Sequence, residues 1–416
     1  MHAVIPIVLL ELACPPAFAG GDAGADTPPP FVASRTEKGL TFEVGKSKMN
    51  FDVFFQPRFT FRQSGDPDVD APDRWDGTGF QVRRMLFLAN GVLTPRLGYT
   101  FRVNFAGTKD ALTSFSDDGD VTMFSTATFA TPVLDDARLN YKVADAFQVA
   151  FGRFKVPYSG HWLVGVYDLA FPERSAVIDG IRAGGLQMDG FGYKRDTGLA
   201  ITGNAIERRV DWAVGVFSGD GGSTAGLVFP PADDGYLYTA RIAVAPLGAF
   251  EMRDLDTKHG RPRLGLGVNA GFDDNPVYGH DRRLDASRTD VHLGGEVRFA
   301  ASGLNLQAEY HLGRTLGDDD TAKANGFLVQ GTYVIPDPAL VPGLRFSRMD
   351  PDAETHDDGY SMAEATLAWL LPEPGAKKAK DRTNRRKVQI AYTLAKADAS
   401  GNLAFHQVML AAQAGL

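Results

Sequence analysis

Apolar and polar residues alternate with a period of two along most of the chain. From Leu97 to Phe105 every second side chain is apolar, and the positions between them carry Gly, Thr, Arg and Asn. This alternation indicates a β-strand with two unlike faces. It recurs in sixteen segments, near residues 49–62, 79–94, 96–107, 133–143, 146–155, 197–204, 210–218, 236–247, 262–272, 289–300, 303–313, 326–336, 342–349, 359–371, 384–395 and 403–414.

The polar face of these segments indicates where the strands lie. A soluble β-sandwich buries packed aliphatic side chains on its inner face, whereas here that face carries Gly, Asn, Gln, Thr and Arg. Segments of about ten residues that are apolar outside and polar inside are typical of membrane barrels with a wet lumen. No run reaches the roughly 18 to 20 apolar residues of a spanning helix. We therefore expect an all-β fold, a single transmembrane antiparallel β-barrel of about sixteen strands over residues 41–416.

The connections between the segments alternate between long and short. A loop rich in Asp, Pro and Gly follows the first segment and long connections follow the third, fifth and seventh, while only Pro95 follows the second segment. Bacterial barrels have this order, with short periplasmic turns and longer outer loops. It places both termini on the periplasmic side. Two turns on the short side, 248–261 and 372–383, are longer than this scheme expects.

The third outer connection, the 41 residues from Val156 to Asp196, is too apolar for a solvated loop. Trp162, Leu163, Val164 and Tyr167 would be unsheltered in water. We expect this loop to fold into the lumen and narrow the pore, bringing bases towards its axis. The candidates for these constriction-loop bases are Lys155, Arg174 and Arg182. The alternative is a loop packed on a neighbouring subunit.

The chain begins with an apolar run followed by an A-x-A pattern at Ala17 and Ala19. We interpret residues 1–19 as a signal peptide and residues 20–40 as a mobile, Pro-rich leader. The single cysteine, Cys14, lies inside the signal, so cleavage leaves no thiol for disulfides or catalysis. Cys14 as a lipoprotein acceptor is the alternative, which Glu11 disfavours.

The formal net charge of −8 argues against a general nucleic-acid binder, which needs a basic surface. The lumen differs from this average, because alternation points ten bases inwards against six carboxylates. Such an excess attracts anions, and guanidinium groups bind phosphate bidentately. Alternatively, the bases pair with the carboxylates and only keep the lumen hydrated. The inward bases are Arg58, Arg62, Arg102, Arg138, Lys142, Arg241, Arg263, Arg298, Arg345 and Lys387, and the carboxylates are Asp52, Asp136, Asp211, Glu296, Glu309 and Glu364.

The adjacent pair Arg83 and Arg84 does not fit a regular strand, whose neighbouring side chains point to opposite faces. Val82, Leu86 and Leu88 set a lipid-facing phase that would send Arg84 outwards. An arginine near the bilayer midplane costs about 2 to 4 kcal/mol. We therefore predict a β-bulge at this pair, or a place near the rim.

Catalytic and metal-binding patterns are lacking. There is no G-x-S-x-G, no H-E-x-x-H and no metal-ligand Cys/His spacing, so we expect no enzyme activity, metal or cofactor. Two other classes stay open: a membrane-embedded hydrolase, which needs a paired Ser and His, and a structural or adhesive barrel with a plugged lumen.

We interpret the acidic clusters of the outer loops as solvated charge in preference to Ca²⁺ or Mg²⁺ sites. They include Asp66 to Asp73, Asp117 to Asp120, Asp318 to Asp320 and Asp350 to Asp358.

Several motifs occur together in one order: FQVRRMLFLANGVLTPRLGYTFRVNFAG, FQVAFGRFKVPYSG, WAVGVFSGDG, LGGEVRFAASGLNLQAEYHLG and LRFSRMDPD. With them the chain resembles the phosphate-selective porin O/P family of bacterial outer-membrane channels, from about residue 40 to the end. The resemblance implies a sixteen-stranded homotrimeric barrel in outer-membrane lipid, with an inward third outer loop, that passes phosphate-like anions. The family's dense lysine and arginine clusters do not match residue by residue, so a general non-selective porin remains the alternative.

Overall fold

The computed structural model describes residues 31–36, 39–64, 78–106, 108–117, 120–130, 132–144, 146–183, 186–219, 235–274, 289–317, 321–372, 384–398 and 403–415. The expected signal peptide, most of the leader and most of the outer acidic clusters lie outside these ranges. None of the helices in the described part of the chain is long and apolar enough to span a membrane.

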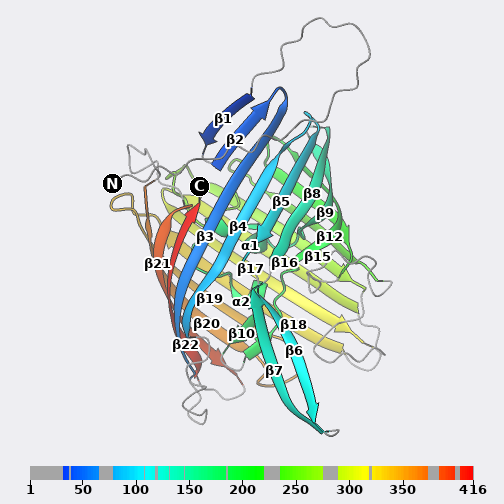
Figure 1. Ribbon diagram of the computed structural model, residues 1–416, viewed down its shortest axis with the longest axis vertical. Coiled ribbons are helices and arrows are strands. Elements are labelled where there is room, and N and C mark those ends of the chain that lie inside the picture. The colour runs from blue at the N-terminus through cyan, green and yellow to red at the C-terminus, as the bar shows by residue number, and fades with distance from the viewer. Residues whose placement is uncertain are drawn as a thin grey trace, which may run out of the picture.

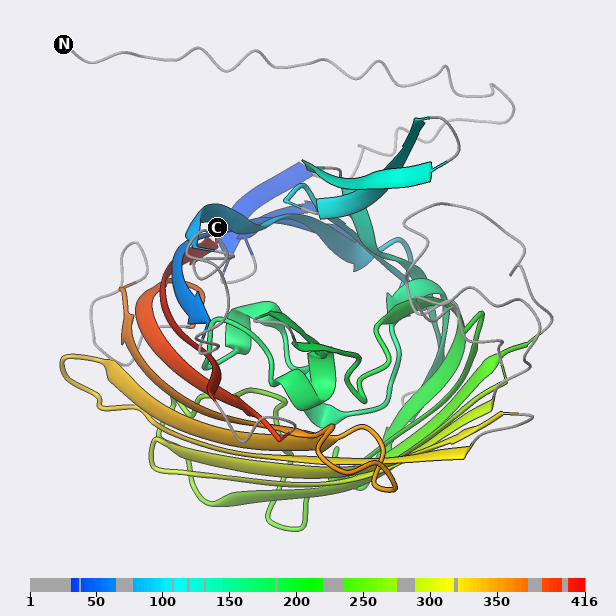
Figure 2. The ribbon, with the colours of Figure 1, turned by 90° about the horizontal axis from the view of Figure 1, so that it is seen from below.

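Sixteen of the described strands close into one antiparallel barrel, as the sequence predicted (Figures 1 and 2). Each strand pairs with the next along the wall, and the last pairs with the first, so no barrel strand has a free edge. The strands are β3 (Ser47–Ser64), β4 (Gly79–Val92), β5 (Leu97–Asn104), β8 (Val133–Ala144), β9 (Phe147–Lys155), β12 (Arg195–Ala205), β13 (Val210–Phe217), β14 (Leu237–Val244), β15 (Arg263–Asp273), β16 (Thr289–Ala301), β17 (Leu304–Leu316), β18 (Thr321–Tyr333), β19 (Leu340–Asp350), β20 (Tyr360–Leu370), β21 (Lys387–Ala397) and β22 (Leu403–Gly415).

The two faces of the wall differ as the alternation predicted. On β19, Leu344 is 69% exposed on the outside, while its neighbour Arg345 is 3% exposed on the inside. Exposed apolar side chains recur at alternate positions around the outer face, where they suit a hydrocarbon environment. The inner face collects the Arg, Glu, Gln, Asn and Thr side chains of the same strands.

Two hairpins lie beyond the sixteen segments. β1 (Phe31–Thr36) and β2 (Gly39–Val44) pair with each other, and β2 extends the sheet beside the start of β3. Residues 20–40 were expected to form a mobile, Pro-rich leader, and within this range residues 31–36 and 39–40 belong to strands. A second hairpin, β6 (Thr108–Asp117) and β7 (Asp120–Ala130), projects from the long-loop end of the barrel (Figure 1).

The connection between β9 and β12 contains short elements: α1 (Gly160–Leu163), a 3-10 turn η2 (Val166–Asp168), α2 (Ala176–Asp179), β10 (Ile181–Ala183) and β11 (Leu186–Met188). Viewed along the barrel, the described residues of 156–194, called the inner segment below, lie within the ring of strands (Figure 2). Val177 and Ile178 are fully buried in a cluster with Leu328 and Tyr360 of the wall. The apolar side chains of the segment thus pack against the wall.

Several register shifts interrupt the barrel ladder, and two of them are β-bulges beside adjacent charged residues. Between β3 and β4, Gln56 faces Arg84 and Pro57 faces Val82, so Arg83 is an extra residue. Pro57 has no N–H for the ladder, a feature that suits a bulge. This confirms the predicted bulge but corrects the predicted phase, because Leu86 is 1% exposed and faces inwards rather than towards lipid. The extra residue reverses the phase of the strand beyond it.

The second bulge lies between β5 and β8. Arg102 faces Asp136 and Val103 faces Leu134, so Asp135 is the extra residue. Both bulges occur at a pair of adjacent charged residues of like sign. In each case the additional residue allows both side chains of the pair to reach the lumen.

Residues in or beside the two turns that seemed too long for the short-turn end contact the inner segment; residues 373–383 of the second turn lie outside the described ranges. In the turn 245–262, the Asp254 carboxylate accepts a hydrogen bond from the Ala170 N–H at 3.1 Å. In the turn 371–386, the Asn384 side chain donates to the Leu169 carbonyl at 3.4 Å. The inner segment therefore extends from the long-loop end, where it leaves β9, to contacts at the short-turn end.

Candidate functional site

Two carboxylates of the barrel wall hold the beginning of the inner segment. Glu296 of β16 accepts a hydrogen bond from the Gly160 N–H at 2.7 Å. Glu309 of β17 accepts from the His161 N–H and from the Ser159 hydroxyl, both at 2.6 Å. These donors are the unpaired N–H groups at the start of the short helix α1, supplemented by its N-cap hydroxyl. Two of the inward carboxylates predicted from the sequence thus bind the segment.

The same two carboxylates pair with arginines of the wall. Arg241 donates to Glu296, and Arg298 lies 3.2 Å from Glu309. A Cβ added at Gly160 would lie 2.1 Å from the Glu296 carboxylate, so only glycine allows this close approach. The pairing fixes the carboxylates, and the carboxylates fix the segment.

His161 ties the two short helices of the segment together. Its Nε2 accepts a hydrogen bond from the Ser175 N–H at 3.1 Å, just before α2, so Nδ1 carries the ring proton. Nδ1 lies 2.8 Å from the side-chain amide of Gln307 on the wall. Burial lowers the pKa of His161 to about 3, so the ring is neutral at neutral pH. This histidine therefore has a structural function in the lumen.

A surplus of positive charge surrounds one carboxylate of the inner segment. Glu173 accepts from Arg58 through Oε1, from Arg83 through both oxygens at 2.5 and 3.2 Å, and from Arg84 through Oε2 at 2.8 Å. We call Arg58, Arg83 and Arg84 the triple-arginine site. Three guanidinium groups face one carboxylate, so the site as a whole carries excess positive charge. The Glu173 side chain is 22% exposed and that of Arg83 is 35% exposed, so water reaches the site.

Glu173 remains ionised in this environment. Burial alone would raise the pKa of its carboxyl, but the charges of Arg83, Arg84 and Arg58 outweigh burial and hold the pKa well below its usual range. The carboxylate is therefore a permanent partner of the triple-arginine site at neutral pH.

Most of the other bases predicted to line the pore pair with carboxylates. Arg102 lies 3.2 Å from Asp135 and 3.6 Å from Asp136, and Arg263 lies 2.6 Å from Asp256. The guanidinium group of Arg345 binds the Glu364 carboxylate with two hydrogen bonds, of 2.5 and 2.7 Å. With Arg241 and Arg298, these arginines fit the interpretation in which wall charges balance one another.

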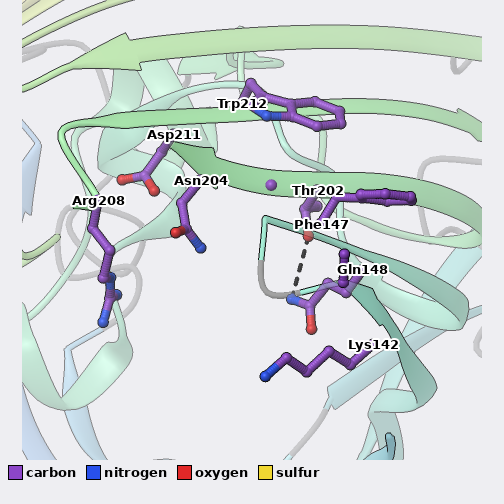
Figure 3. Close-up of a pocket in the computed structure, with 10 residues that line it drawn as sticks. Lys142, Phe147, Gln148, Thr202, Asn204, Arg208, Asp211 and Trp212 are labelled. Atoms are coloured by element: carbon purple, nitrogen blue, oxygen red, sulfur yellow. Dashed lines mark hydrogen bonds between the residues drawn. The ribbon is translucent and has the colours of Figure 1, made fainter. Parts of the chain in front are cut away.

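The remaining wall bases lie in other surroundings. Arg138 lies over the ring of Phe154 at 5.6 Å, and the buried Lys387 donates to the Leu169 carbonyl of the inner segment. Lys142 lines a cavity of about 430 Å³ at the short-turn end, together with Gln148, Thr202, Asn204 and Asp211 (Figure 3). Gln148 donates to Thr202 at 3.3 Å across this polar stretch of wall.

The bases expected to approach the axis from the inner segment are placed as follows. The Lys155 ammonium donates to the carbonyls of Trp162 and Val164, at 2.7 and 2.8 Å, and stabilises the end of α1. Arg174 donates to the same Val164 carbonyl at 2.6 Å and lies 4.8 Å over the Trp162 ring. Both bases thus hold the segment's own backbone. The Arg182 backbone belongs to β10, and its side chain lies outside what the structure describes.

The centre of the charged site was not predicted from the sequence. Arg83 and Arg84 stood out only as an anomaly of the strand, and Glu173 was not among the candidate residues. Pro57 on the opposite strand was an available signal, because proline within a barrel strand marks a bulge. No local pattern connects Glu173 to these arginines.

Metal binding and hydrolysis would each require particular side chains to meet at one site. Among the described residues, no group of three or more His, Cys, Asp or Glu side chains is arranged to hold a metal ion. For a hydrolase, one described arrangement of a serine and a histidine is that of Ser159 and His311, which both contact the Oε2 atom of Glu309. Both side chains are fully buried, so they do not form an accessible nucleophile and base.

Comparisons with solved structures agree with the architecture. OmpT of Vibrio cholerae, as a mutant lacking loop L8, aligns with a TM-score of 0.54 and 12% identity, over 89% of this chain and 100% of that one. The anion-selective porin of Comamonas acidovorans gives the same values. OmpF of Salmonella typhi, in complex with daunomycin, gives 0.53 and 12%, over 89% and 98% of the two chains. At these identities the likeness concerns the fold alone.

The family comparison covers more than half of the chain. A search among curated proteins finds no match. The family model described as phosphate-selective porin O and P matches residues 58–340, from within β3 to the start of β19. Together with the closed sixteen-stranded wall, this match shows that the chain belongs to the phosphate-selective porin O and P family, whose fold is that of outer-membrane porin channels.

Proposed function

We propose that this porin passes small hydrophilic anions, such as phosphate or a similar oxyanion, through the bacterial outer membrane. In this proposal the chain is exported by its signal peptide, residues 1–19, and forms a homotrimer in outer-membrane lipid. Transport is passive and uses no cofactor. The inner segment narrows the lumen and determines where an anion passes closest to charged side chains.

The observation that supports anion selectivity is the triple-arginine site. Arg58, Arg83 and Arg84 share the single carboxylate of Glu173, whereas the other wall arginines are largely balanced by carboxylates. Uncompensated guanidinium charge at a water-filled constriction raises the local concentration of anions and repels cations. Neither the total charge of the chain nor the evenly paired part of the wall would produce this preference.

The reversal potential of the purified protein in a planar bilayer under a potassium chloride gradient tests the proposal. We expect the wild-type potential to indicate preference for chloride over potassium. Arg83→Gln should reduce that preference. The reduction should be clearest below about 0.1 M salt, where the Debye length exceeds about 10 Å and charges act over a longer distance. Arg348→Gln is the matched control, because this half-exposed arginine pairs with Asp398 at the long-loop end. A wild-type potential near zero would indicate a general non-selective porin.

A closed structural barrel is the second candidate, favoured by one observation. The inner segment is bound along its length, at Glu296 and Glu309, at the triple-arginine site, and at both long turns of the short-turn end. A segment held in this way could plug the lumen. Absence of any single-channel conductance in folded, purified protein would support this candidate over a channel.

A further inference from the structure

We propose that the triple-arginine site binds the carboxylate group of a passing solute, and that Glu173 is an internal carboxylate that occupies the site until the solute displaces it. This inference rests on the proposed function and assigns a substrate class, small organic carboxylates, to its charged site. The inference goes beyond a general attraction of anions, because in it the Glu173 carboxylate competes with the solute carboxylate for the same arginines.

The geometry of the site matches a planar carboxylate. One edge of the Arg83 guanidinium meets both oxygens of Glu173, with Nε at 2.5 Å from Oε1 and Nη2 at 3.2 Å from Oε2. Arg58 donates to Oε1 and Arg84 donates to Oε2, one from each side. Parallel N–H donors facing two coplanar oxygens form the fork that recognises carboxylates. A free carboxylate placed on Glu173's position would make all of these contacts.

Two of the three arginines do not depend on Glu173 for their position. The Arg84 guanidinium also donates to the Gln56 side chain and, at 3.1 Å, to the Pro172 carbonyl. Arg58 also donates to the Gln81 side chain at 2.9 Å. These partners are neutral and, apart from Pro172, belong to the barrel wall. Arg58 and Arg84 therefore stay in place when the Glu173 carboxylate leaves, whereas the hydrogen bonds described for Arg83 both go to Glu173, so Arg83 is the arginine that turns to meet the solute.

Exchange requires only a movement of the Glu173 side chain. Its backbone carbonyl accepts a hydrogen bond from Arg345 at 3.1 Å, so the backbone is held to the wall independently of the carboxylate. The partial exposure of Glu173 and Arg83 gives a solute access to the site. Side-chain rotation within a fixed backbone is fast compared with rearrangement of a loop.

A tethered carboxylate weakens the binding of a free one, because it competes at a high effective concentration, in the millimolar range for short flexible tethers. Removing it should therefore tighten the binding of free carboxylates. Glu173→Ala vacates the position, whereas Glu173→Gln retains the shape and removes the charge. We expect affinity for a free carboxylate to rise in both variants and to rise more in Glu173→Ala.

The test measures block of the chloride current by acetate and by inorganic phosphate, in planar bilayers containing the purified full-length protein. We expect Glu173→Ala to lower the half-blocking concentration of acetate by about tenfold or more. Glu354→Gln is the matched control, because it removes a carboxylate that pairs with Lys323 in the exposed long-loop region, and it should leave the value unchanged. Adding Arg83→Gln to Glu173→Ala should return acetate block to the wild-type value or weaker.

The outcomes separate this inference from the proposed function. Equal acetate block in wild type and in both Glu173 variants, with a reversal potential that still indicates anions, would overturn the internal competitor and leave the anion channel intact. A phosphate block that strengthens more than the acetate block would show a site for tetrahedral oxyanions and overturn the carboxylate assignment. A cation-preferring or non-selective wild type would overturn the proposed function itself.

Discussion

Arginine side chains in the lumen serve two different purposes, which depend on the number of carboxylates nearby. Arg345 and Glu364 form a one-to-one pair with two hydrogen bonds, and such a pair contributes no net charge to the lumen. At the triple-arginine site, the carboxylate of Glu173 pairs with three guanidinium groups, and among the described residues the next carboxylate that acts on Arg83 and Arg84 is the more distant Asp179. Replacing a residue of the first kind should affect folding, whereas replacing one of the second kind should affect permeation.

Gly160→Ala should disturb the inner segment, because the new Cβ would lie 2.1 Å from the Glu296 carboxylate, which Arg241 also holds. Crowding of this kind costs about 1 to 3 kcal/mol. We expect faster proteolysis within the inner segment and noisier single-channel currents, with an intact barrel. Gly295→Ala is the matched control on β16, where an added Cβ meets no atom within 4 Å. Equal behaviour of the two variants would contradict this account of Gly160.

The Glu173 carboxylate should remain ionised in acid beyond the range of an ordinary glutamate. Because its pKa is lowered in the folded protein, its stabilising contribution is complete above the ordinary value of about 4.3 and is lost only as the pH falls through the lowered pKa. We expect the difference in conductance between wild type and Glu173→Gln to be constant from pH 7 to pH 4 and to vanish at lower pH. Disappearance of this difference above pH 4.3 would show that the arginines do not hold the carboxylate.

The bulges at Arg83 and at Asp135 are two of the places where the barrel wall departs from a regular ladder; the register also shifts between β8 and β9 and between β21 and β22. Arg83 in β4 and Asp135 in β8 are each an additional residue beside a second residue of like charge. Strict alternation would send one member of each pair towards lipid, so the bulge places both in the lumen. The sixteen strands themselves follow the predicted segments, because each needs only its own alternation to separate lipid from water.

Deletion of Arg83 should be tolerated by the barrel, because it removes the extra residue and leaves Arg84 opposite Gln56 and Val82 opposite Pro57. Phe87 lies in register with Val53. Its deletion should instead exchange the inward and outward faces of one part of β4, so that polar side chains of that part point towards lipid. The measurement is the mobility of unheated and heated samples on a denaturing gel, where a folded barrel migrates differently. Equal loss of the folded band in both variants would contradict the role of Arg83 as the bulge residue.

At the scale of the whole molecule, the inner segment connects parts of the wall that are far apart in the chain. Asp254 and Asn384 bind it from two turns of the short-turn end, while Glu296 and Glu309 bind its beginning. The contact of Asp254 with the segment gives the long turn 248–261 a structural role, whereas residues 373–383 of the other long turn lie outside the described part of the chain. The barrel wall nonetheless closes through strand pairing alone, without any contribution from the segment.

Deletion of residues 160–180 should therefore leave a folded barrel with a wider lumen. Glu296 and Glu309 would still pair with Arg241 and Arg298, so the deletion leaves these wall carboxylates compensated. We expect higher single-channel conductance and weaker discrimination between chloride and phosphate. Unchanged conductance with loss of the oligomer on an unheated gel would identify the segment as a contact between subunits.

The sequence by itself determined the barrel wall, because contact with lipid on one face and water on the other imposes a polarity that repeats every two residues. It also predicted the bulge at Arg83 and Arg84 and the apolar character of the inner segment. Only the tertiary structure decided which lumenal bases carry uncompensated charge. Glu173 is 115 residues from Arg58 and 90 from Arg83, and their meeting depends on how a loop folds through the lumen. Pairing over such separations depends on the path of the whole chain, and no local periodicity encodes it.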